Sequence, residues 1–413
     1  MYCVARSLLL AALVASCGCS AAAQTVDYTL YSVLDRPRPD TAPLGARVGS
    51  FVFTPALLSS VAFDDNIYAT KGARAADTVA RLRPSFLLRS DWRVHSLEIF
   101  GDAETVRYRR HAAEDHADAR LGLRGVIEAQ RGFEIGYRAS WLRQHDDRGA
   151  NDGFSFALPF DKPVAHDRLE AGLSLNKRFG RLTASLAEDF AAVRYGDNSI
   201  LGNRVALSAR DFASLATRGR LGFDLTAITQ LFGEVAFESR RFRARQADSL
   251  GLRAVAGLRF EASRRVNGEF FAGYLGRSFA RTGPSDIHTY TYGGNLSWLT
   301  TPLLTLTLLG RRDTQESYDG ATLGAYIQST AELRADYELR RNLIVSTRLG
   351  LEQDDFRAAQ RRDRFAALSA SVSYAINRAL QVSLDCRFVR RVSDVSAANY
   401  SRNIFGASLR AQY

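Results

Sequence analysis

Most of the chain alternates between apolar and polar residues with a period of two. In residues 333–340, apolar positions on one side alternate with Arg334, Asp336, Glu338 and Arg340 on the other. Such alternation predicts β-strands that have one apolar and one polar face. The same pattern recurs in residues 133–141, 252–260, 304–308 and 380–388. The pattern therefore predicts an all-β protein.

The turn signals between these runs predict a transmembrane antiparallel up-and-down β-barrel. Tight turns, such as Gly180-Arg181 and Arg341-Asn342, alternate with long polar connections, such as residues 144–167 and 391–401. Outer-membrane barrels have this alternation of short periplasmic turns and longer outer loops. An even number of strands places both termini in the periplasm. We expect about 18 strands, at residues 51–63, 78–91, 95–108, 118–130, 133–144, 168–179, 182–195, 211–225, 228–240, 250–263, 266–279, 288–299, 303–312, 323–340, 343–354, 364–376, 379–390 and 402–413.

A soluble propeller or solenoid is the alternative for an all-β chain with regular turns. Two features favour the membrane barrel. Several runs alternate for a dozen residues or more, and only a closed barrel presents an apolar face to lipid without an unpaired edge. The last strand, with Phe405 and Tyr413 on one face, also resembles the C-terminal signal that the barrel-assembly machinery recognises. We therefore expect contact with that machinery and with outer-membrane lipid.

The N-terminus predicts export. Residues 1–23 combine Arg6, an apolar stretch and a run of three alanines, as in a signal peptide. A lipoprotein signal acylated at Cys17 is the alternative. Cleavage after residue 23 leaves Cys386 as the one remaining cysteine, so no intramolecular disulfide is expected.

The segment that follows the signal predicts a different role from the barrel. Residues 24–49 are aperiodic and contain several prolines, so we expect a periplasmic N-terminal segment without strands. Residues 50–413 form the expected barrel. The candidate plug of its lumen consists of Arg36, Pro37, Arg38 and Pro39.

Composition agrees with a folded barrel and gives it a basic balance. The chain of 413 residues is 46% hydrophobic and 24% charged, which is too apolar for disorder and too charged for a helical membrane bundle. Of 55 basic residues only Lys71, Lys162 and Lys177 are lysines, and removal of Arg6 leaves 54 basic against 44 acidic residues, a net charge of about +10. An exported barrel meets no nucleic acid, so we expect no such partner.

Charged residues on the polar faces are the candidate pore lining. Ladders of arginine and carboxylate that stiffen the wall are one interpretation. A lumen of net positive potential, which attracts anionic solutes or an acidic polysaccharide, is the other. The candidates are Arg138, Arg220, Arg253, Arg259, Arg334, Asp336, Arg348, Asp385, Arg387 and Arg410.

Other polar clusters offer weaker chemistry. Residues 64–66, Asp-Asp-Asn, could bind Ca²⁺, although such a cluster more often caps a turn. Residues 145–147, His-Asp-Asp, bring together groups that some outer-membrane proteases use, but neighbours in one loop do not assemble a site. The histidines show no metal-ligand spacing. We therefore expect no catalytic residue, no cofactor and no metal.

Six short motifs in the first third of the chain resemble a known family. The similar residues are 36–39, Arg-Pro-Arg-Pro; 43–45, Pro-Leu-Gly; 49–51, Gly-Ser-Phe; Pro55; 63–68, Phe-Asp-Asp-Asn-Ile-Tyr; and Pro84 with 90–92, Ser-Asp-Trp. They are similar to putative β-barrel porin 2, a family of Gram-negative outer-membrane barrels that often accompany exopolysaccharide export. The resemblance implies a barrel in the outer membrane and, as partners, periplasmic polysaccharide-export proteins.

These observations together predict a channel for hydrophilic material and no enzyme. Exopolysaccharide export is the first hypothesis. A general or anion-preferring diffusion porin is the second, and a structural or adhesive barrel with a closed lumen is the third.

Overall fold

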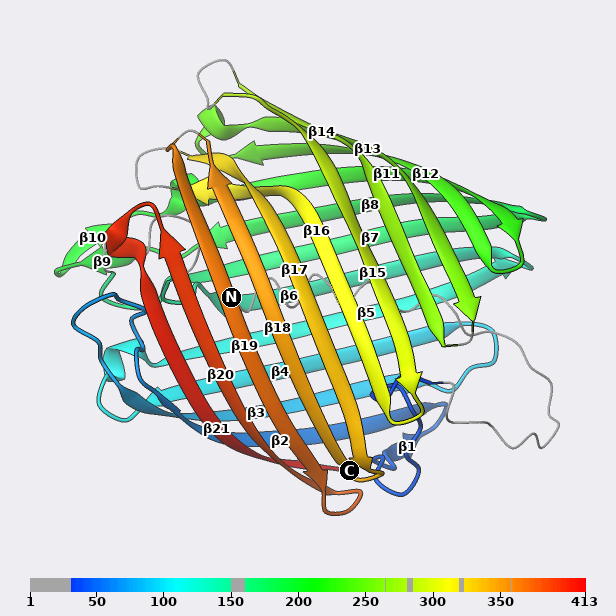
Figure 1. The fold of residues 1–413 in the computed structure, drawn as a ribbon, viewed down its shortest axis with the longest axis horizontal. Coiled ribbons are helices and arrows are strands. Elements are labelled where there is room, and N and C mark those ends of the chain that lie inside the picture. Colours follow the sequence, from blue (N-terminus) through cyan, green and yellow to red (C-terminus); the bar gives the residue numbers. More distant parts are fainter. Residues whose placement is uncertain (1–30, 150–159, 264, 281–284, 319–322, 358) are drawn as a thin grey trace.

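The computed structural model describes residues 31–149, 160–263, 265–280, 285–318, 323–357 and 359–413. These residues form a closed antiparallel barrel of 18 strands (Figure 1). Each strand pairs with the next in the sequence, and β21 pairs with β2 to close the sheet. The predicted fold class is confirmed. The residues of the expected signal peptide, including Cys17, lie outside the described residues.

All 18 predicted strands are present. The largest difference is at β16, which ends at Tyr318 instead of residue 312. A bilayer needs strands of about 9 to 11 residues, so strands of 13 to 18 residues extend beyond its apolar layer. The barrel strands are β2 (Phe51–Asp64), β3 (Asp77–Ser90), β4 (Ser96–Tyr108), β5 (His116–Gln130), β6 (Phe133–His145), β7 (Ala165–Phe179), β8 (Leu182–Tyr195), β11 (Phe212–Thr226), β12 (Thr229–Phe242), β13 (Ser249–Ser263), β14 (Val266–Phe279), β15 (Ile287–Thr301), β16 (Leu304–Tyr318), β17 (Leu323–Arg340), β18 (Leu343–Phe356), β19 (Arg361–Ala375), β20 (Leu380–Ser393) and β21 (Tyr400–Gln412).

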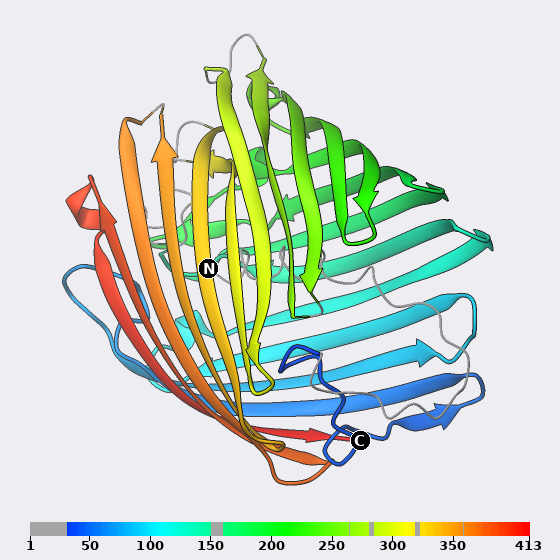
Figure 2. The same cartoon turned by 45° about the vertical axis from the view of Figure 1, so that its right-hand side comes forward.

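The two ends of the barrel differ in their connections. Two-residue turns, at 131–132, 180–181, 227–228 and 341–342, lie at one end, which we call the short-turn end. The C-terminus lies at the same end (Figures 1 and 2). The longer connections lie at the opposite end, which we call the long-loop end. The predicted alternation of short and long connections is therefore present.

The N-terminal segment contains a strand that the sequence analysis did not predict. β1 (Ala46–Val48) pairs with Phe51–Phe53 of β2. Gly49 makes this possible, because its φ of +60° is a conformation that favours glycine in the turn between β1 and β2. The expectation of a strand-free segment over residues 24–49 is wrong at this point.

A second unpredicted hairpin lies in the connection between β8 and β11. It consists of β9 (Asn198–Ile200) and β10 (Asn203–Val205). The Asp161 carboxylate accepts hydrogen bonds from Ser199 Oγ at 2.6 Å and from two backbone N–H groups of the hairpin turn. The bond from Ser199, supported by those from the backbone, lowers the pKa of Asp161. The hairpin could not be predicted from the sequence, because a strand of three residues, such as 198–200, is too short to show alternation.

Helical structure is minor. The described residues contain short 3₁₀ turns at the long-loop end: η2 (Ala112–Glu114), η3 (Ser208–Arg210), η4 (Arg245–Ala247) and η5 (Ser396–Ala398). Among the described residues, no helix is long and apolar enough to cross a membrane.

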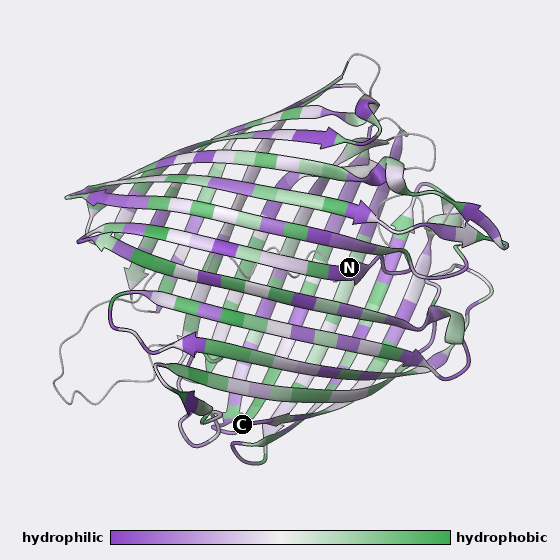
Figure 3. Cartoon of the chain, turned by 180° about the vertical axis from the view of Figure 1, so that it is seen from behind, coloured by the Kyte–Doolittle hydropathy of each residue, from purple (hydrophilic) through white to green (hydrophobic). Residues whose placement is uncertain are grey.

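Alternation gives the barrel an apolar outer face. Leu221, Leu384 and Val61 are each more than half exposed, and they share their face with the other exposed leucines and aromatics of the strands. Figure 3 shows the alternating hydropathy along each strand. Cys386 is free and half-buried, and it has the same parity as Leu384. The outer face is therefore suited to lipid.

Exposed aromatic residues mark the short-turn end of this face. Trp92, Phe179 and Trp298 are between 43% and 57% exposed. Aromatic residues of this kind are enriched at both membrane interfaces. Tyr68 lies at the opposite, long-loop end, where its ring packs edge-on against His111.

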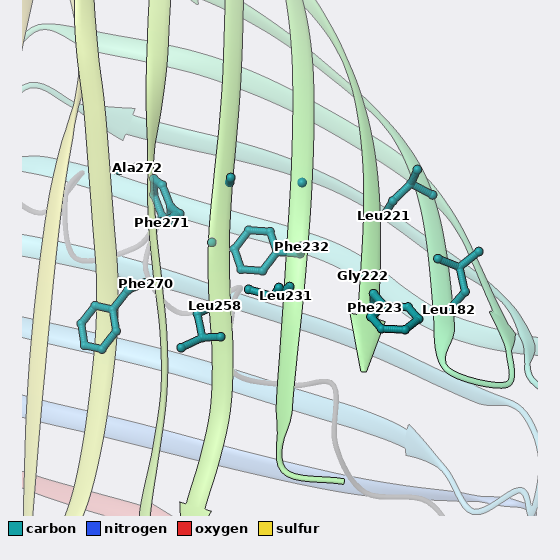
Figure 4. A pocket seen from close by; sticks show the side chains of 13 residues that line it. Leu182, Leu221, Gly222, Phe223, Leu231, Phe232, Leu258, Phe270, Phe271 and Ala272 are labelled. Atoms are coloured by element: carbon teal, nitrogen blue, oxygen red, sulfur yellow. The ribbon is translucent and has the colours of Figure 1, made fainter. Parts of the chain in front are cut away.

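A shallow apolar groove of ≈ 800 Å³ crosses the outer face from β8 to β14 (Figure 4). Its exposed lining residues include Leu182, Leu221, Phe223, Leu231 and Phe270. Phe232 extends to the opposite face, where its ring occupies the space left by Gly257. The groove is therefore part of the lipid-facing wall.

Buried apolar clusters lie where the loops pack on the strand ends. One contains Phe160, Val164 and Leu207, and another contains Val193, Phe212 and Phe242. They fix the long loops against the long-loop end.

Candidate pore lining and N-terminal segment

Charged side chains cover the concave face of the barrel. The clearest evidence is Arg220 on β11, which donates to Glu269 on β14 at 2.9 and 3.0 Å. Two strands separate these residues, and side chains converge enough to bridge them only on the inside of a curved sheet. The polar face of the strands is therefore the interior face.

Two carboxylates on β4 are each shared by one arginine on β3 and one on β5. Asp102 accepts hydrogen bonds from Arg83 at 2.8 Å and from Arg120 at 2.9 Å. Glu98 accepts from Arg89 at 2.8 Å and from Arg124 at 2.6 Å. Each carboxylate thus bridges guanidinium groups of the two neighbouring strands.

The same arrangement continues from β6 to β14. Asp189 lies 2.6 Å from Arg138 and 3.8 Å from Arg218. Glu234 contacts Arg218, Arg220 and Arg253. Glu269 contacts Arg220, and also Arg259 at 3.2 Å. Four of the predicted pore-lining residues, Arg138, Arg220, Arg253 and Arg259, therefore belong to one network.

The predicted residues of β17 and β18 form two local pairs. Arg334 lies 2.8 Å from Asp336, which also accepts a hydrogen bond from Ser346 Oγ at 2.5 Å. Arg348 lies 3.1 Å from Glu332. These pairs face the interior, opposite the exposed Leu333 and Tyr337.

The remaining three predicted residues lie on β20 and β21. Asp385 leans over Gly406 on β21, and Arg387 follows on the same face. Arg410 is exposed on the interior face of β21. The structure thus places seven of the ten predicted residues in the ion pairs described above.

Arginines outnumber carboxylates within the shared networks. From β3 to β14, nine arginines contact five carboxylates, which leaves an excess of four positive charges. The ion pairs join neighbouring strands of the wall, as the ladder interpretation predicts. The excess refers to these networks, and further carboxylates, such as Glu134, Asp224 and Glu261, share the polar faces of the same strands.

The N-terminal segment binds the interior wall at the short-turn end. Arg36 donates to Glu338 at 2.9 Å and to the Pro302 carbonyl, and Arg38 donates to Glu338 at 3.1 Å. The Val33 N–H donates to Thr305 Oγ1 at 2.9 Å. Arg36 is 8% and Glu338 3% exposed, so the contact is buried.

The other two residues of the candidate plug have no such contact. Pro37 and Pro39 are exposed and connect the two arginines to the rest of the segment. Arg36 and Arg38 therefore hold residues 33–38 on β16 and β17. Figure 2 shows this blue segment near the C-terminus.

The Asp64-Asp65-Asn66 cluster acts as a turn cap. Asp64 accepts hydrogen bonds from the Asn66 N–H at 3.0 Å and from Arg402 at 2.5 and 2.8 Å. Asp65 accepts from Asn403, and Asn66 bonds to the backbone of Thr70. The side-chain oxygens of the cluster accept hydrogen bonds from neighbouring backbone and side-chain groups, as the capping hypothesis predicts.

A group of histidines that was not predicted from the sequence lies at the long-loop end. His116, Asp118 and His145 come together from β5 and β6, and His111 lies nearby with its Nδ1 2.8 Å from Asp77. Only the pairing of β5 with β6 brings His116 and His145 together, which explains why spacing along the chain gave no sign of it. The His145-Asp146-Asp147 run contributes His145 to this group.

Comparison with solved structures gives outer-membrane proteins of low sequence identity. OpdK of Pseudomonas aeruginosa, solved with vanillate, has 12% identity and a TM-score of 0.47, over 87% of this chain and 99% of its own. OccAB3 of Acinetobacter baumannii has 10% identity and a TM-score of 0.46, over 89% and 100%. The siderophore receptor PirA from the same organism has 8% and 0.45, over 87% and 80%.

No curated protein matches the chain. The model of the family described as putative beta-barrel porin 2 matches residues 38–413, which is most of the chain and includes all 18 barrel strands. The resemblance that the N-terminal motifs indicated is therefore confirmed over the whole barrel, and the chain belongs to the putative β-barrel porin 2 family.

Proposed function

We propose that the chain is an anion-preferring channel for hydrophilic material in the outer membrane of a Gram-negative bacterium. The observation that carries this proposal is the sharing of carboxylates by arginines on the interior face. Asp102 and Glu98 each contact two arginines, and Glu234 contacts three. Membership of a porin family supports passage through the lumen.

The excess charge gives the lumen its preference. A cleft lined by one sign of charge concentrates counter-ions, and low-dielectric walls strengthen this field. Rings of arginine or lysine select anions in pores by the same principle. Salt screens the field, with a Debye length of about 10 Å at 0.1 M, so the preference weakens as salt rises.

Export of an acidic exopolysaccharide is the finer form of this proposal. Such a polymer carries negative charge at repeated intervals, and arginines on strands from β3 to β14 would meet it over much of the wall. Periplasmic export proteins are the corresponding partners. Polysaccharide polymerase and export genes beside this gene would support export over diffusion of small anions.

Ion selectivity in planar bilayers tests the channel directly. We expect the reversal potential under a salt gradient to show anion preference, and the triple variant Arg253→Gln, Arg259→Gln, Arg334→Gln to move it toward cations. Arg204→Gln is the matched control, because Arg204 is exposed on the β9–β10 hairpin, outside the lumen networks. A reversal potential that the triple variant leaves unchanged would contradict the charge argument. A barrel that never conducts, with or without its N-terminal segment, would favour a structural or adhesive role.

A further inference from the structure

His116, Asp118 and His145 offer three metal-ligating atoms within 4.8 Å of one another at the long-loop end. His116 begins β5 and His145 ends β6, so the antiparallel pairing of these strands brings them together. Their ring centroids lie 3.6 Å apart. We propose that this cluster binds one divalent transition-metal ion of the Zn²⁺ type.

The hydrogen bonds of His116 leave a nitrogen available for the metal. Its Nδ1 lies 2.7 Å from the Glu114 carbonyl oxygen, so Nδ1–H donates and Nε2 keeps its lone pair. Metal-bound histidines usually donate their second ring N–H to a carbonyl or carboxylate in this way. The main chain of η2 thus orients His116 as a ligand.

In His145 the nitrogen that faces the other ligands is Nδ1, and the outer nitrogen is Nε2. Nδ1 lies 3.0 Å from Asp118 Oδ2, and Nε2 lies 3.6 Å from Asp147 Oδ1. Two ligands of a tetrahedral ion with bonds of about 2.0 to 2.1 Å lie about 3.3 Å apart. Asp118 and His145 are therefore already close to ligand spacing. Asp147 lies on the side where it can accept a hydrogen bond from Nε2–H.

The donor set determines the class of ion. Two imidazole nitrogens and one carboxylate suit Zn²⁺, Ni²⁺ or Cu²⁺, whereas Ca²⁺ and Mg²⁺ prefer oxygen ligands alone. On binding, the metal takes the Nδ1 lone pair of His145 after the Nδ1 proton leaves to water. Water supplies the fourth ligand.

Bound metal would join two loops that already contact each other. Arg148 donates to Glu114 at 2.6 and 2.9 Å, and Glu114 is 3% exposed. The Arg148–Glu114 ion pair therefore joins residues 109–115 to residues 146–149. Metal bound by His116 and His145 would add a second connection beside it. The site is a clamp on the rim of the barrel, and it does not depend on whether the lumen conducts.

Calorimetric titration of the folded, detergent-solubilised barrel with Zn²⁺ tests this inference. We expect one Zn²⁺ per chain, a loss of saturable binding in His116→Gln and His145→Gln, and unchanged binding in His288→Gln. His288 is the matched control, because it also lies near a strand end and bonds to Tyr274, outside the cluster. Asp147→Asn should weaken binding by about 10-fold or more, as expected for a partner of a ligand.

Spectroscopy separates a lost site from a misfolded variant. We expect Cu²⁺ in the unmodified barrel to show coupling to two ligand nitrogens, and to one nitrogen in His145→Gln that retains the heat-resistant electrophoretic mobility of a folded barrel. Titration with Ca²⁺ should show no binding at this site. Absence of saturable Zn²⁺ binding, or equal loss in His288→Gln, would overturn the proposal and leave the two rings as a packing contact.

Discussion

Arg36 and Glu338 are 302 residues apart in the chain, and their side chains meet at 2.9 Å on the interior wall of the barrel. Arg38 contacts the same carboxylate. One buried glutamate therefore holds the N-terminal segment in place. Its loss leaves the buried Arg36 guanidinium without a carboxylate, which costs about 3 kcal/mol or more.

Release of this segment should open the short-turn end. We expect Glu338→Gln to raise single-channel conductance toward that of a chain lacking residues 24–44. The deletion stops before Ala46, because β1 pairs with β2. Glu332→Gln is the control on the same strand, since its partner is Arg348. Equal conductance in the deletion and the unmodified barrel would show that the segment does not obstruct the lumen.

A buried charge cluster should make Asp363 important for stability. Asp363 and Arg391 are fully buried and lie 2.7 Å apart, and Arg361 contacts the same carboxylate at 2.8 Å. Asp363→Asn keeps the shape but removes the charge, so we expect the free energy of unfolding in urea to fall by about 3 to 5 kcal/mol.

The control for Asp363→Asn is the loss of an ion pair that is accessible to water. Glu332→Gln breaks a pair whose side chains are 25% and 43% exposed, and it should cost about 0 to 1 kcal/mol. Similar losses in the two variants would mean that burial does not determine the contribution of Asp363.

The two faces of a strand should respond differently to arginine. Leu384 is 59% exposed on the outer face, so Leu384→Arg should cost about 2 to 4 kcal/mol in a bilayer. Ser383→Arg faces the interior and loses a hydrogen bond to Ser373, worth about 1 kcal/mol. Folding titrations into lipid vesicles measure both. Equal damage at both positions would argue against lipid on the outer face.

Labelling of intact cells should show which end faces outward. In a Cys386→Ala background, an impermeant maleimide should modify Arg204→Cys in the β9–β10 hairpin and leave Asn342→Cys unmodified. The reason is that short turns of outer-membrane barrels face the periplasm. The reverse pattern would invert the orientation of the long-loop end.

Strands could be predicted from the sequence because each one faces lipid on one side and water on the other. Because of this contrast, apolar and polar residues alternate with a period of two in runs such as residues 333–340. The alternation stops at turns that contain glycine, asparagine or proline. β1 and the β9–β10 hairpin escaped prediction, because three residues are too few to display a period.

Contacts between distant residues could not be predicted in the same way. The Arg36–Glu338 pair depends on how the N-terminal segment folds back into the barrel, and the His116–His145 contact depends on the register of β5 against β6. Alternation specifies which face a residue occupies, and it does not specify its neighbour across the sheet. The arginines were correctly assigned to the polar face, but their sharing of carboxylates required the structure.

The seam between the first and last barrel strands has a consequence for biogenesis. β21 covers Ala56–Asp64 of β2, while β1 covers Phe51–Phe53. Every other neighbouring pair of barrel strands is consecutive in sequence, so closure of the barrel between β21 and β2 must wait for the final residues of the chain. A nascent chain without β21 would expose two unpaired strand edges to lipid, where each unsatisfied backbone group costs several kcal/mol. Pairing of the C-terminal strand therefore reports that synthesis and export are complete, since only a complete chain can leave its assembly factors as a closed cylinder.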